Sequence, residues 1–399
     1  MTAALALALI SAAASVASIA VSHITLGPAF ALLLFARAKL RLPPFWPATA
    51  FFLLWTLAAI AASESPAAGR SQIVKFYVFL TLATLSTVLN LRRARGLLMA
   101  IAALGTASAL WSFVEFWQRW SRARASGQPF YQSYVADRIT GFKSHWMTFG
   151  GEMMVVLAIA GALLLFSRER HRKWWLAAGA IVALALALSW VRSAWFGGAA
   201  AAVYLLWFWK RWTVAALPVA IAFGVWLAPP EIQQRVTSLW KPDKKLDSNS
   251  HRRALWATGV RMIAANPLLG VGPEHVQREF ERYAPAEYKP IPSHWYYGHL
   301  HNIYLEYAAE RGLPALLAFL AMTAWALRDF ARAVARSDPS ERTRRFILHA
   351  AMASVIAILV GGIGEHNLGD SEVLGLFFTM LCCGYAAVNE KEPADVQPA

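Results

Sequence analysis

The sequence predicts an all-α polytopic membrane protein with about 12 transmembrane helices. The first reason is composition: 58% of the 399 residues are hydrophobic, only 15% are charged, and the mean hydropathy is +0.42. A soluble protein would carry nearer a quarter charged residues. The second reason is a series of apolar runs close to the roughly 20 residues that cross a bilayer. The third is that Lys and Arg cluster between these runs.

The apolar runs define the predicted helices. No basic segment precedes the first run, so we interpret it as a membrane helix and not as a cleaved signal peptide. The run at 24–36 is the weakest, and it can instead form half of a hairpin with the first. The predicted spans are 2–22, 24–36, 45–63, 74–90, 97–116, 147–166, 175–191, 194–209, 213–228, 313–327, 346–362 and 372–388.

Alternate short loops carry most of the basic residues. They hold Arg37, Lys39 and Arg41; Arg92, Arg93 and Arg95; Arg168, Arg170, Arg172 and Lys173; Lys210 and Arg211; and Arg328, Arg332, Arg336, Arg342, Arg344 and Arg345. The intervening short loops contain little beyond Arg70 and Arg192. Because cytoplasmic loops are enriched in Lys and Arg, this alternation predicts an even number of spans with both termini cytoplasmic.

Two long extracytoplasmic loops, 117–146 and 229–302, are also basic. Long loops cross the membrane largely regardless of charge, so this charge either handles an anionic ligand or contacts anionic lipid headgroups. Within the second loop, residues 252–266 have the apolar spacing of an amphipathic helix at the membrane surface. The predicted organisation is N-terminal transmembrane helices at 1–228, a large helical loop at 229–302, C-terminal transmembrane helices at 303–388 and a disordered cytoplasmic tail at 389–399.

The net charge of +15 does not indicate nucleic-acid binding. The basic residues lie in loops between membrane spans and do not line a continuous basic face, which argues against a nucleic-acid partner. The two cysteines, Cys382 and Cys383, are adjacent within an apolar run and predict neither a disulfide framework nor a metal site.

Two histidines stand where the second long loop returns to the membrane. Histidine is the side chain best able to take or give a proton near neutral pH. His299 and His301 lack the i, i+4 spacing of a helical zinc site, and no acidic ligand stands nearby at metal-ligand spacing, so no metal is predicted. His301 is the candidate general base. The alternative for both histidines is a structural hydrogen bond at the start of the helix.

Four arginines on the same side are candidates for binding an anion. Arg192 stands at a membrane-edge turn, where an arginine is costly and by default functional, although snorkelling to the headgroups is the alternative. Arg138 precedes the sixth span and has the alternative of a solvated loop residue. Arg252 and Arg253 open the amphipathic helix. Several guanidinium groups together can hold a pyrophosphate without a metal.

The loop 364–370 is polar and lies between the last two spans. It either contacts an acceptor or caps helix ends, and the sequence favours neither.

These pieces together resemble the O-antigen ligase family of bacterial inner-membrane glycosyltransferases. The resemblance runs from about Arg138 to Asp370. It consists of Arg138-x-x-Gly141, Ser189-x-x-Arg192-Ser-Ala-Trp, Arg252-x-x-x-Trp256, Asn266-Pro-Leu-Leu-Gly-Val-Gly272 and His299-x-His301-Asn302-x-Tyr304-Leu. Each piece alone is weak, but their order around one large loop is fairly specific for the superfamily.

The resemblance implies a GT-C-like fold with a periplasmic active site, an undecaprenyl-diphosphate-linked donor and a lipid A core acceptor. It also implies catalysis without a metal or other cofactor, by a monomer in the inner membrane. His301, Arg192 and Arg252 would be catalytic. The substrate-binding residues would be Arg138, His299, Arg253, Asn302 and Tyr304. His299 stands where relatives can carry other residues, which leaves its role open.

Other functions remain possible at this point. The superfamily also holds O-antigen polymerases and protein O-oligosaccharyltransferases, which these motifs do not separate. A lipid-linked sugar transporter is the alternative from another class. Transporters tend to have ionisable groups at the bilayer midplane and repeated halves. Here the key charges gather on one face and no repeat is evident.

Overall fold

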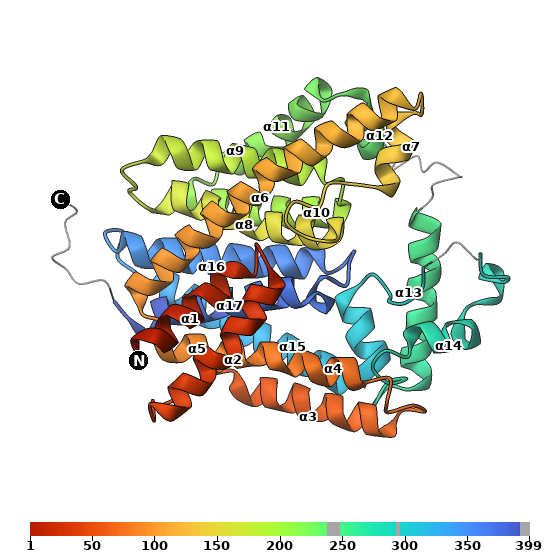
Figure 1. The fold of residues 1–399 in the computed structure, drawn as a ribbon, viewed down its shortest axis with the longest axis horizontal. Coiled ribbons are helices and arrows are strands. Elements are labelled where there is room, and N and C mark those ends of the chain that lie inside the picture. The colour runs from red at the N-terminus through yellow and green to blue at the C-terminus, as the bar shows by residue number, and fades with distance from the viewer. Residues whose placement is uncertain (238–247, 293–295, 392–399) are drawn as a thin grey trace.

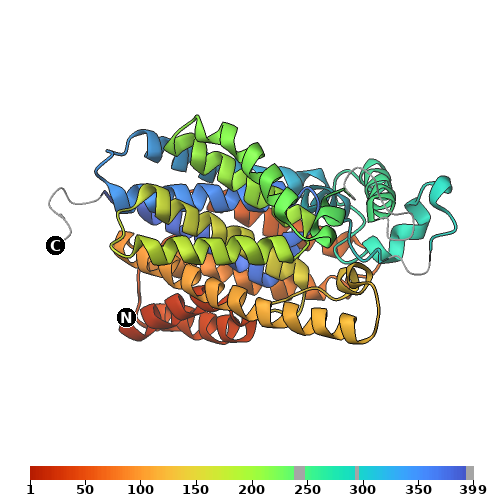
Figure 2. The ribbon, with the colours of Figure 1, turned by 90° about the horizontal axis from the view of Figure 1, so that it is seen from above.

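The computed structural model describes residues 1–237, 248–292 and 296–391. Within these residues every regular element is a helix, and the helices form one elongated bundle (Figures 1 and 2). Among the described helices, six are long and apolar enough to cross a membrane. These are the continuous stretch of α4, η1 and α5 (Arg70–Val88), α6 (Leu91–Ala125), α8 (Trp146–Phe166), α15 (Ile303–Ala335), α16 (Arg342–Gly361) and α17 (Ser371–Asn389). The prediction of an all-helical membrane protein is therefore confirmed, whereas the count of 12 and the GT-C likeness stay predictions.

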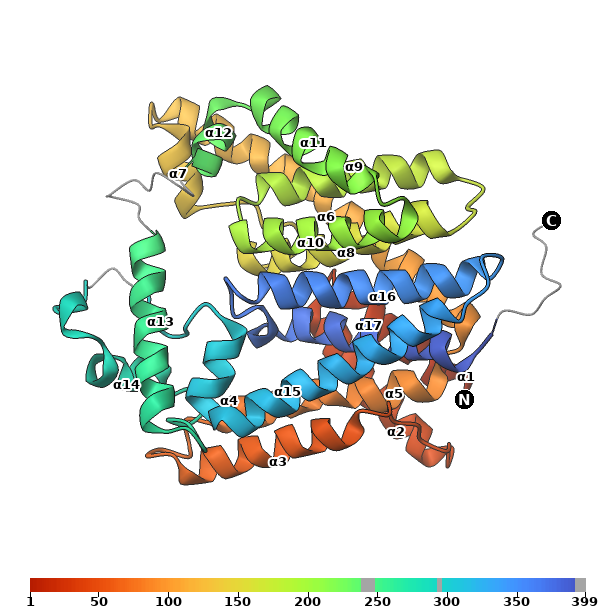
Figure 3. The ribbon, with the colours of Figure 1, turned by 180° about the vertical axis from the view of Figure 1, so that it is seen from behind.

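Three helices form the centre of the bundle: α8, α16 and α17, which bury most of their side chains. The remaining helices pack around them (Figures 1 and 3). On one side lie α6, α9 (Arg172–Leu188), α10 (Arg192–Trp209) and α11 (Thr213–Leu227). On the other lie α3 (Trp46–Ala62), α4, α5 and α15. Exposed apolar side chains on α11, such as Val219 and Trp226, fit a lipid environment.

The N-terminal prediction needs a correction, because residues 2–22 are not one helix. The chain forms α1 (Thr2–Ala14) and α2 (Ile19–Phe35), which pack against each other as a hairpin. The break follows from Ser15, whose hydroxyl bonds the carbonyl of Ala12, and from Ser18, whose side chain caps α2. At about 1.5 Å per residue, the 13 residues of α1 reach about 20 Å, short of the roughly 30 Å hydrocarbon core.

The helix α1 begins and α17 ends at the same end of the bundle (Figures 1 and 2). This arrangement is what an even number of crossings requires. The opposite end carries α7 (Phe130–Ala136), α12 (Pro230–Thr237), α13 (Ser248–Ala265) and α14 (Val276–Tyr283), and we refer to it as the loop end. Which side of a membrane the loop end faces stays a prediction.

Much of the predicted loop 117–146 is helical, as the end of α6 and as α7. The helix α6 continues to Ala125 and is 35 residues long, so it extends about 52 Å and projects beyond a bilayer core. The structure confirms a helix over most of the predicted 252–266 segment, as α13. It lies across the loop end (Figures 1 and 3). Lys241, Lys244, Lys245 and residues 392–399, which include most of the predicted disordered tail, lie outside the described residues.

The long loop is anchored to α15 at a kink. Gly312 has φ +79°, which interrupts the helical hydrogen bonding and frees the last carbonyls of the preceding turn. The amides of Val271 and Gly272 donate to the carbonyls of Ala309 and Glu310, at 2.8 and 3.0 Å. The Asn266–Gly272 motif therefore has a structural task, which is to dock the chain that follows α13 onto α15.

Candidate functional site

The histidine segment is fixed at the start of α15. Asn302 caps this helix: its Oδ1 accepts from the amides of Tyr304 and Leu305, and its Nδ2 donates to the carbonyl of Ile363. The hydroxyl of Tyr304 donates to the carbonyl of Leu359. These bonds join the start of α15 to the end of α16. The contacts of Asn302 and Tyr304 are thus with the protein, and their substrate-binding roles stay predictions.

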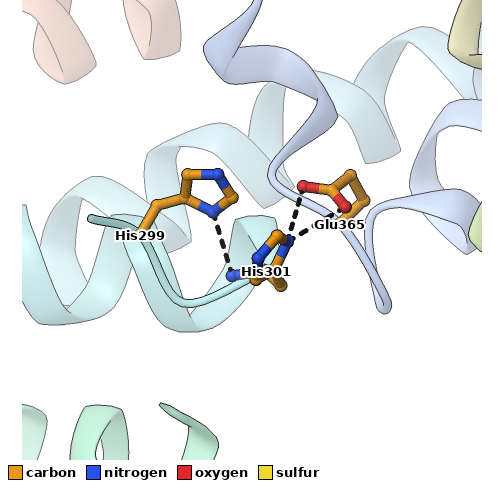
Figure 4. A group of neighbouring side chains, drawn as sticks. All are labelled: His299, His301 and Glu365. Atoms are coloured by element: carbon orange, nitrogen blue, oxygen red, sulfur yellow. Dashed lines mark hydrogen bonds and ion pairs between the residues drawn. The ribbon is translucent and has the colours of Figure 1, made fainter. Parts of the chain in front are cut away.

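His301 and Glu365 form a hydrogen-bonded pair (Figure 4). Nδ1 of His301 lies 2.9 and 3.0 Å from the two carboxylate oxygens of Glu365. The left-handed backbone of His301, with φ +48°, is uncommon for a residue with a side chain and is often found at functional sites. A carboxylate partner places the proton on Nδ1, so Nε2 is the nitrogen that can accept a proton from a substrate.

Glu365 is ionised although it is buried. Burial alone would raise the pKa of this carboxyl, but His301, His299 and Arg252 together lower it to about 2. Nη2 of Arg252 lies 4.0 Å from Oε2 of Glu365, and the amide of His366 donates to Oε1 at 3.0 Å. The sequence left the loop 364–370 unassigned. The pairing across 64 residues exists only in the folded protein.

His299 contacts His301 from the same segment. Its Nδ1 accepts from the backbone amide of His301 at 3.3 Å, and the two rings lie 4.2 Å apart between centroids. Burial and the neighbouring His301 lower the pKa of His299 to about 4. His299 is therefore neutral at pH 7. Its ring can donate a hydrogen bond from Nε2, but it has no positive charge with which to attract a phosphate.

The lowered pKa of His299 makes the fold sensitive to acid. In the unfolded chain this side chain has its ordinary pKa of 6.5, so between pH 6.5 and about 4 the unfolded state binds more protons than the folded state. The free energy of unfolding therefore decreases as the pH falls through this window. We expect His299→Gln, which cannot titrate, to reduce the loss of thermal stability between pH 7 and pH 4.5. Equal acid sensitivity in both proteins would contradict this assignment.

The histidine pair and Glu365 also meet a distance criterion for a metal site. One ligand atom from each of His299, His301 and Glu365 lies within 4.8 Å of the others. The sequence showed no acidic ligand at metal-ligand spacing near the histidines, but the fold brings Glu365 to them from 64 residues away. Two features oppose a divalent cation. Nδ1 of His301 is already engaged by Glu365, and the charge of Arg252 adjoins the same carboxylate.

Of the predicted arginines, Arg252 contacts this pair, and the charges of Arg192 and Arg252 both act on Arg138. Arg138 and Arg192 are 8% and 6% exposed, and Arg192 is the first residue of α10. Burial together with the charges of Arg235, Arg192 and Arg252 lowers the pKa of the Arg138 guanidinium to about 9. The side chain of Arg252 faces Glu365. By contrast, the side chain of Arg253, the next residue along α13, is exposed.

Two further groups at the site were not singled out by the sequence. Arg235 on α12 is 8% exposed and is the charge with the largest effect on Arg138. His145 caps α8 through Nδ1, which accepts from the amide of Met147. Burial lowers the pKa of His145, while Glu365 opposes this change and Arg138 adds to it. No spacing rule connects these residues to His301, so sequence patterns carried no signal for them.

One comparison with known proteins bears on this site. Residues 177–320 match a family model described as O-Antigen ligase. The matched segment contains Arg192, Arg235, Arg252, His299 and His301, whereas Arg138 and Glu365 lie outside it. No curated protein matches the chain.

Proposed function

We propose that this chain, which matches an O-antigen ligase family model over residues 177–320, is an O-antigen ligase. The reaction would transfer a polysaccharide from undecaprenyl diphosphate to a sugar hydroxyl of the lipid A core. The observation that carries this proposal is the pairing of His301 with ionised Glu365, next to Arg252, at one end of a membrane bundle. A base, its orienting carboxylate and a cationic site are what a metal-independent inverting transfer needs.

In this mechanism His301 acts as the general base. The acceptor oxygen attacks the anomeric carbon of the donor while its proton passes to Nε2 of His301. The bond between the anomeric carbon and the phosphate oxygen breaks, and its electron pair leaves with the lipid diphosphate. Because attack and departure occur on opposite faces, the anomeric configuration is inverted. Glu365 stabilises the imidazolium as it forms.

Arg192, Arg252 and Arg138 would bind the diphosphate. Negative charge grows on the leaving phosphate in the transition state, and buried guanidinium groups stabilise it without rearranging. All three are at most partly exposed, which keeps their interaction with an anion less screened by water. The positive charge of the three arginines would take the place of the metal ion that neutralises phosphate in many other transferases.

The acceptor would bind at the predicted loop 117–146. A small surface cavity of about 50 Å³ lies there, between the end of α6 and α7. Its lining residues are Arg119, Arg122, Phe130, Ser133, Tyr134 and Asp137. The two guanidinium groups and the aromatic rings suit a phosphorylated saccharide. We further propose that the loop end faces the periplasm, that both termini are cytoplasmic and that the enzyme is a monomer in the inner membrane.

Reconstitution tests this function directly. Purified protein in liposomes is supplied with polysaccharide on undecaprenyl diphosphate and with lipid A core, and the covalent product is separated by electrophoresis. We expect the polysaccharide to appear on lipid A core, and we expect excess EDTA to leave the rate unchanged because no metal takes part. Strict dependence on a divalent metal would contradict the metal-free mechanism.

The same assay separates the ligase from a polymerase. A polymerase would lengthen the lipid-linked chain when lipid A core is omitted, and a ligase would not. Elongation of the donor without transfer to lipid A core would replace the proposed function by polymerisation.

A further inference from the structure

One carboxylate on α6 holds the segment 138–143, which begins with Arg138 and leads into α8. Oε2 of Glu115 accepts from the backbone amides of Thr140 and Gly141, at 2.9 and 2.7 Å. Its Oε1 accepts from the hydroxyl of Thr140 at 3.0 Å. Hydrogen bonds to a carboxylate are stronger than those between neutral groups. A single side chain of α6 therefore fixes two consecutive residues of the segment.

The rest of this segment is also held closely by its neighbours. Gly141 has φ +59°, and an added Cβ would stand 2.4 Å from Oγ of Ser108, so the backbone lies directly against α6. The amide of Phe142 donates to the same hydroxyl at 3.1 Å. Nζ of Lys143 lies 3.0 Å from Oε1 of Glu152 on α8, and both side chains are buried. The segment is thus fixed between α6 and α8.

The guanidinium of Arg138 depends on this fixed backbone for its position. Its Nε donates to the carbonyl of Val135 at 3.2 Å, and its Nη1 donates to the carbonyl of Trp190 at 3.4 Å. The ring of Trp146 lies 5.2 Å from the guanidinium carbon. The two hydrogen bonds are long and their acceptors are neutral, so they orient the side chain more weakly than a carboxylate would. The position of the backbone therefore decides where the guanidinium lies.

Glu115 also reaches the other side of Arg138, through Arg119. Nη1 of Arg119 lies 3.6 Å from Oε1 of Glu115, and its Nη2 lies 3.1 Å from Oδ1 of Asp137. Asp137 directly precedes Arg138 in the chain. The carboxylate of Glu115 thus holds the chain after Arg138 directly and the chain before it through one arginine.

We propose that Glu115 is a positioning residue, which fixes the segment 138–143 on α6 and thereby holds the Arg138 guanidinium in place for an anionic ligand. The inference rests on the proposed function, in which Arg138 binds the donor diphosphate. Glu115 itself does not contact the donor in this assignment, because its carboxylate would repel a phosphate and is occupied by backbone amides. A guanidinium that is ordered in advance binds more tightly, because less free energy is lost in ordering it.

Binding of undecaprenyl diphosphate to the full-length protein in detergent tests this role. Glu115→Gln loses the charge but keeps the shape and an oxygen that can accept from both amides. Glu115→Asp keeps the charge, but its shorter side chain cannot reach both amides. We expect Glu115→Gln to stay within about threefold of the wild-type affinity, and Glu115→Asp and Glu115→Ala to bind about tenfold more weakly. A Glu115→Asp protein that binds as tightly as Glu115→Gln, or more tightly, would overturn the positioning role.

A double-mutant cycle with Arg138→Ala separates positioning from a general loss of structure. Arg138→Ala alone should weaken binding about tenfold, and an unchanged affinity would overturn the inference. Because Glu115 acts through Arg138, adding Glu115→Ala to Arg138→Ala should weaken binding by less than about a further twofold. Additive losses would overturn the role, because a merely structural carboxylate matters whether or not Arg138 is present. If Glu115→Ala does not fold, Glu115→Asp replaces it in the cycle with the same expectation.

Glu169→Ala is the matched control. The side chain of Glu169 has the same exposure as that of Glu115, 14%, and it also pairs with an arginine of α6, Arg95, at 2.6 Å. It lies between α8 and α9, at the end of the bundle opposite the loop end (Figure 1). We expect wild-type affinity in Glu169→Ala. A loss as large as that in Glu115→Ala would contradict a role specific to the segment 138–143.

Failure of this inference is distinguishable from failure of the proposed function. Diphosphate affinity that depends on Glu115 only through Arg138, without any transfer to lipid A core, would contradict the ligase and support the positioning role. Normal transfer together with additive losses of affinity would contradict the positioning role alone.

Discussion

His301→Ala is expected to lower the rate of polysaccharide transfer by about 10²–10⁴-fold while the protein still folds and inserts. The imidazole of His301 is the group whose Nε2 remains available once Nδ1 is bonded to Glu365. Removing it leaves the acceptor hydroxyl without a base. The variant keeps the capping bonds of Asn302 that hold the start of α15, so the fold should be retained. Initial rates of transfer in the reconstituted system measure the effect.

Two further variants sharpen this test. Glu365→Gln should cause a smaller loss of rate than His301→Ala, because the amide can still orient the ring but no longer stabilises the imidazolium. His171→Ala replaces an exposed histidine next to the start of α9, away from the loop end, and should leave the rate of transfer unchanged. Full activity of His301→Ala would remove this residue from the mechanism and leave the base unassigned.

Gly312→Ala is expected to destabilise the protein by about 3 kcal/mol. Gly312 has φ +79° and ψ 170°, a conformation essentially confined to glycine. An added Cβ would stand 1.8 Å from the carbonyl oxygen of Leu268, which belongs to backbone and cannot rotate away. The segment 267–272 would be forced off α15, together with the amide bonds of Val271 and Gly272. A fall of roughly 3–4 °C in the thermal midpoint, measured in detergent, would show this loss of stability.

The control for Gly312 is Gly96→Ala on α6. A Cβ at Gly96 meets nothing within 4 Å, and alanine favours the helix, so stability should be unchanged or slightly higher. Transfer should also fall in Gly312→Ala, since displacing 267–272 also displaces α13, which carries Arg252. A Gly312→Ala protein with the wild-type thermal midpoint would mean that α15 can close its kink.

Much of the fold could be predicted because it depends on local composition. Apolar runs of sufficient length predicted the membrane helices, whereas the even number of crossings that the basic loops indicate stays a prediction. The prediction of one helix over residues 2–22 was wrong, because hydropathy does not detect a serine that caps a helix. Ser15 and Ser18 lie at the break that divides these residues between α1 and α2. The predicted span 97–116 is part of a longer helix, because α6 stays helical to Ala125, where its sequence becomes polar.

The sequence by itself determined the class of protein and the chemical types at the candidate site, and its motifs predicted a resemblance that a family model matches over residues 177–320. Placing a histidine and arginines at a membrane edge costs free energy, so these residues could be identified as functional candidates from the sequence alone. Tertiary structure alone decided which of them meet. Glu365 reaches His301 across 64 residues, and Arg235 meets Arg138 on the carbonyl of Trp190. The physical reason is that hydrogen bonds and charge interactions act over a few ångströms, and only packing of α12, α13, α15 and α16 brings these groups within that range.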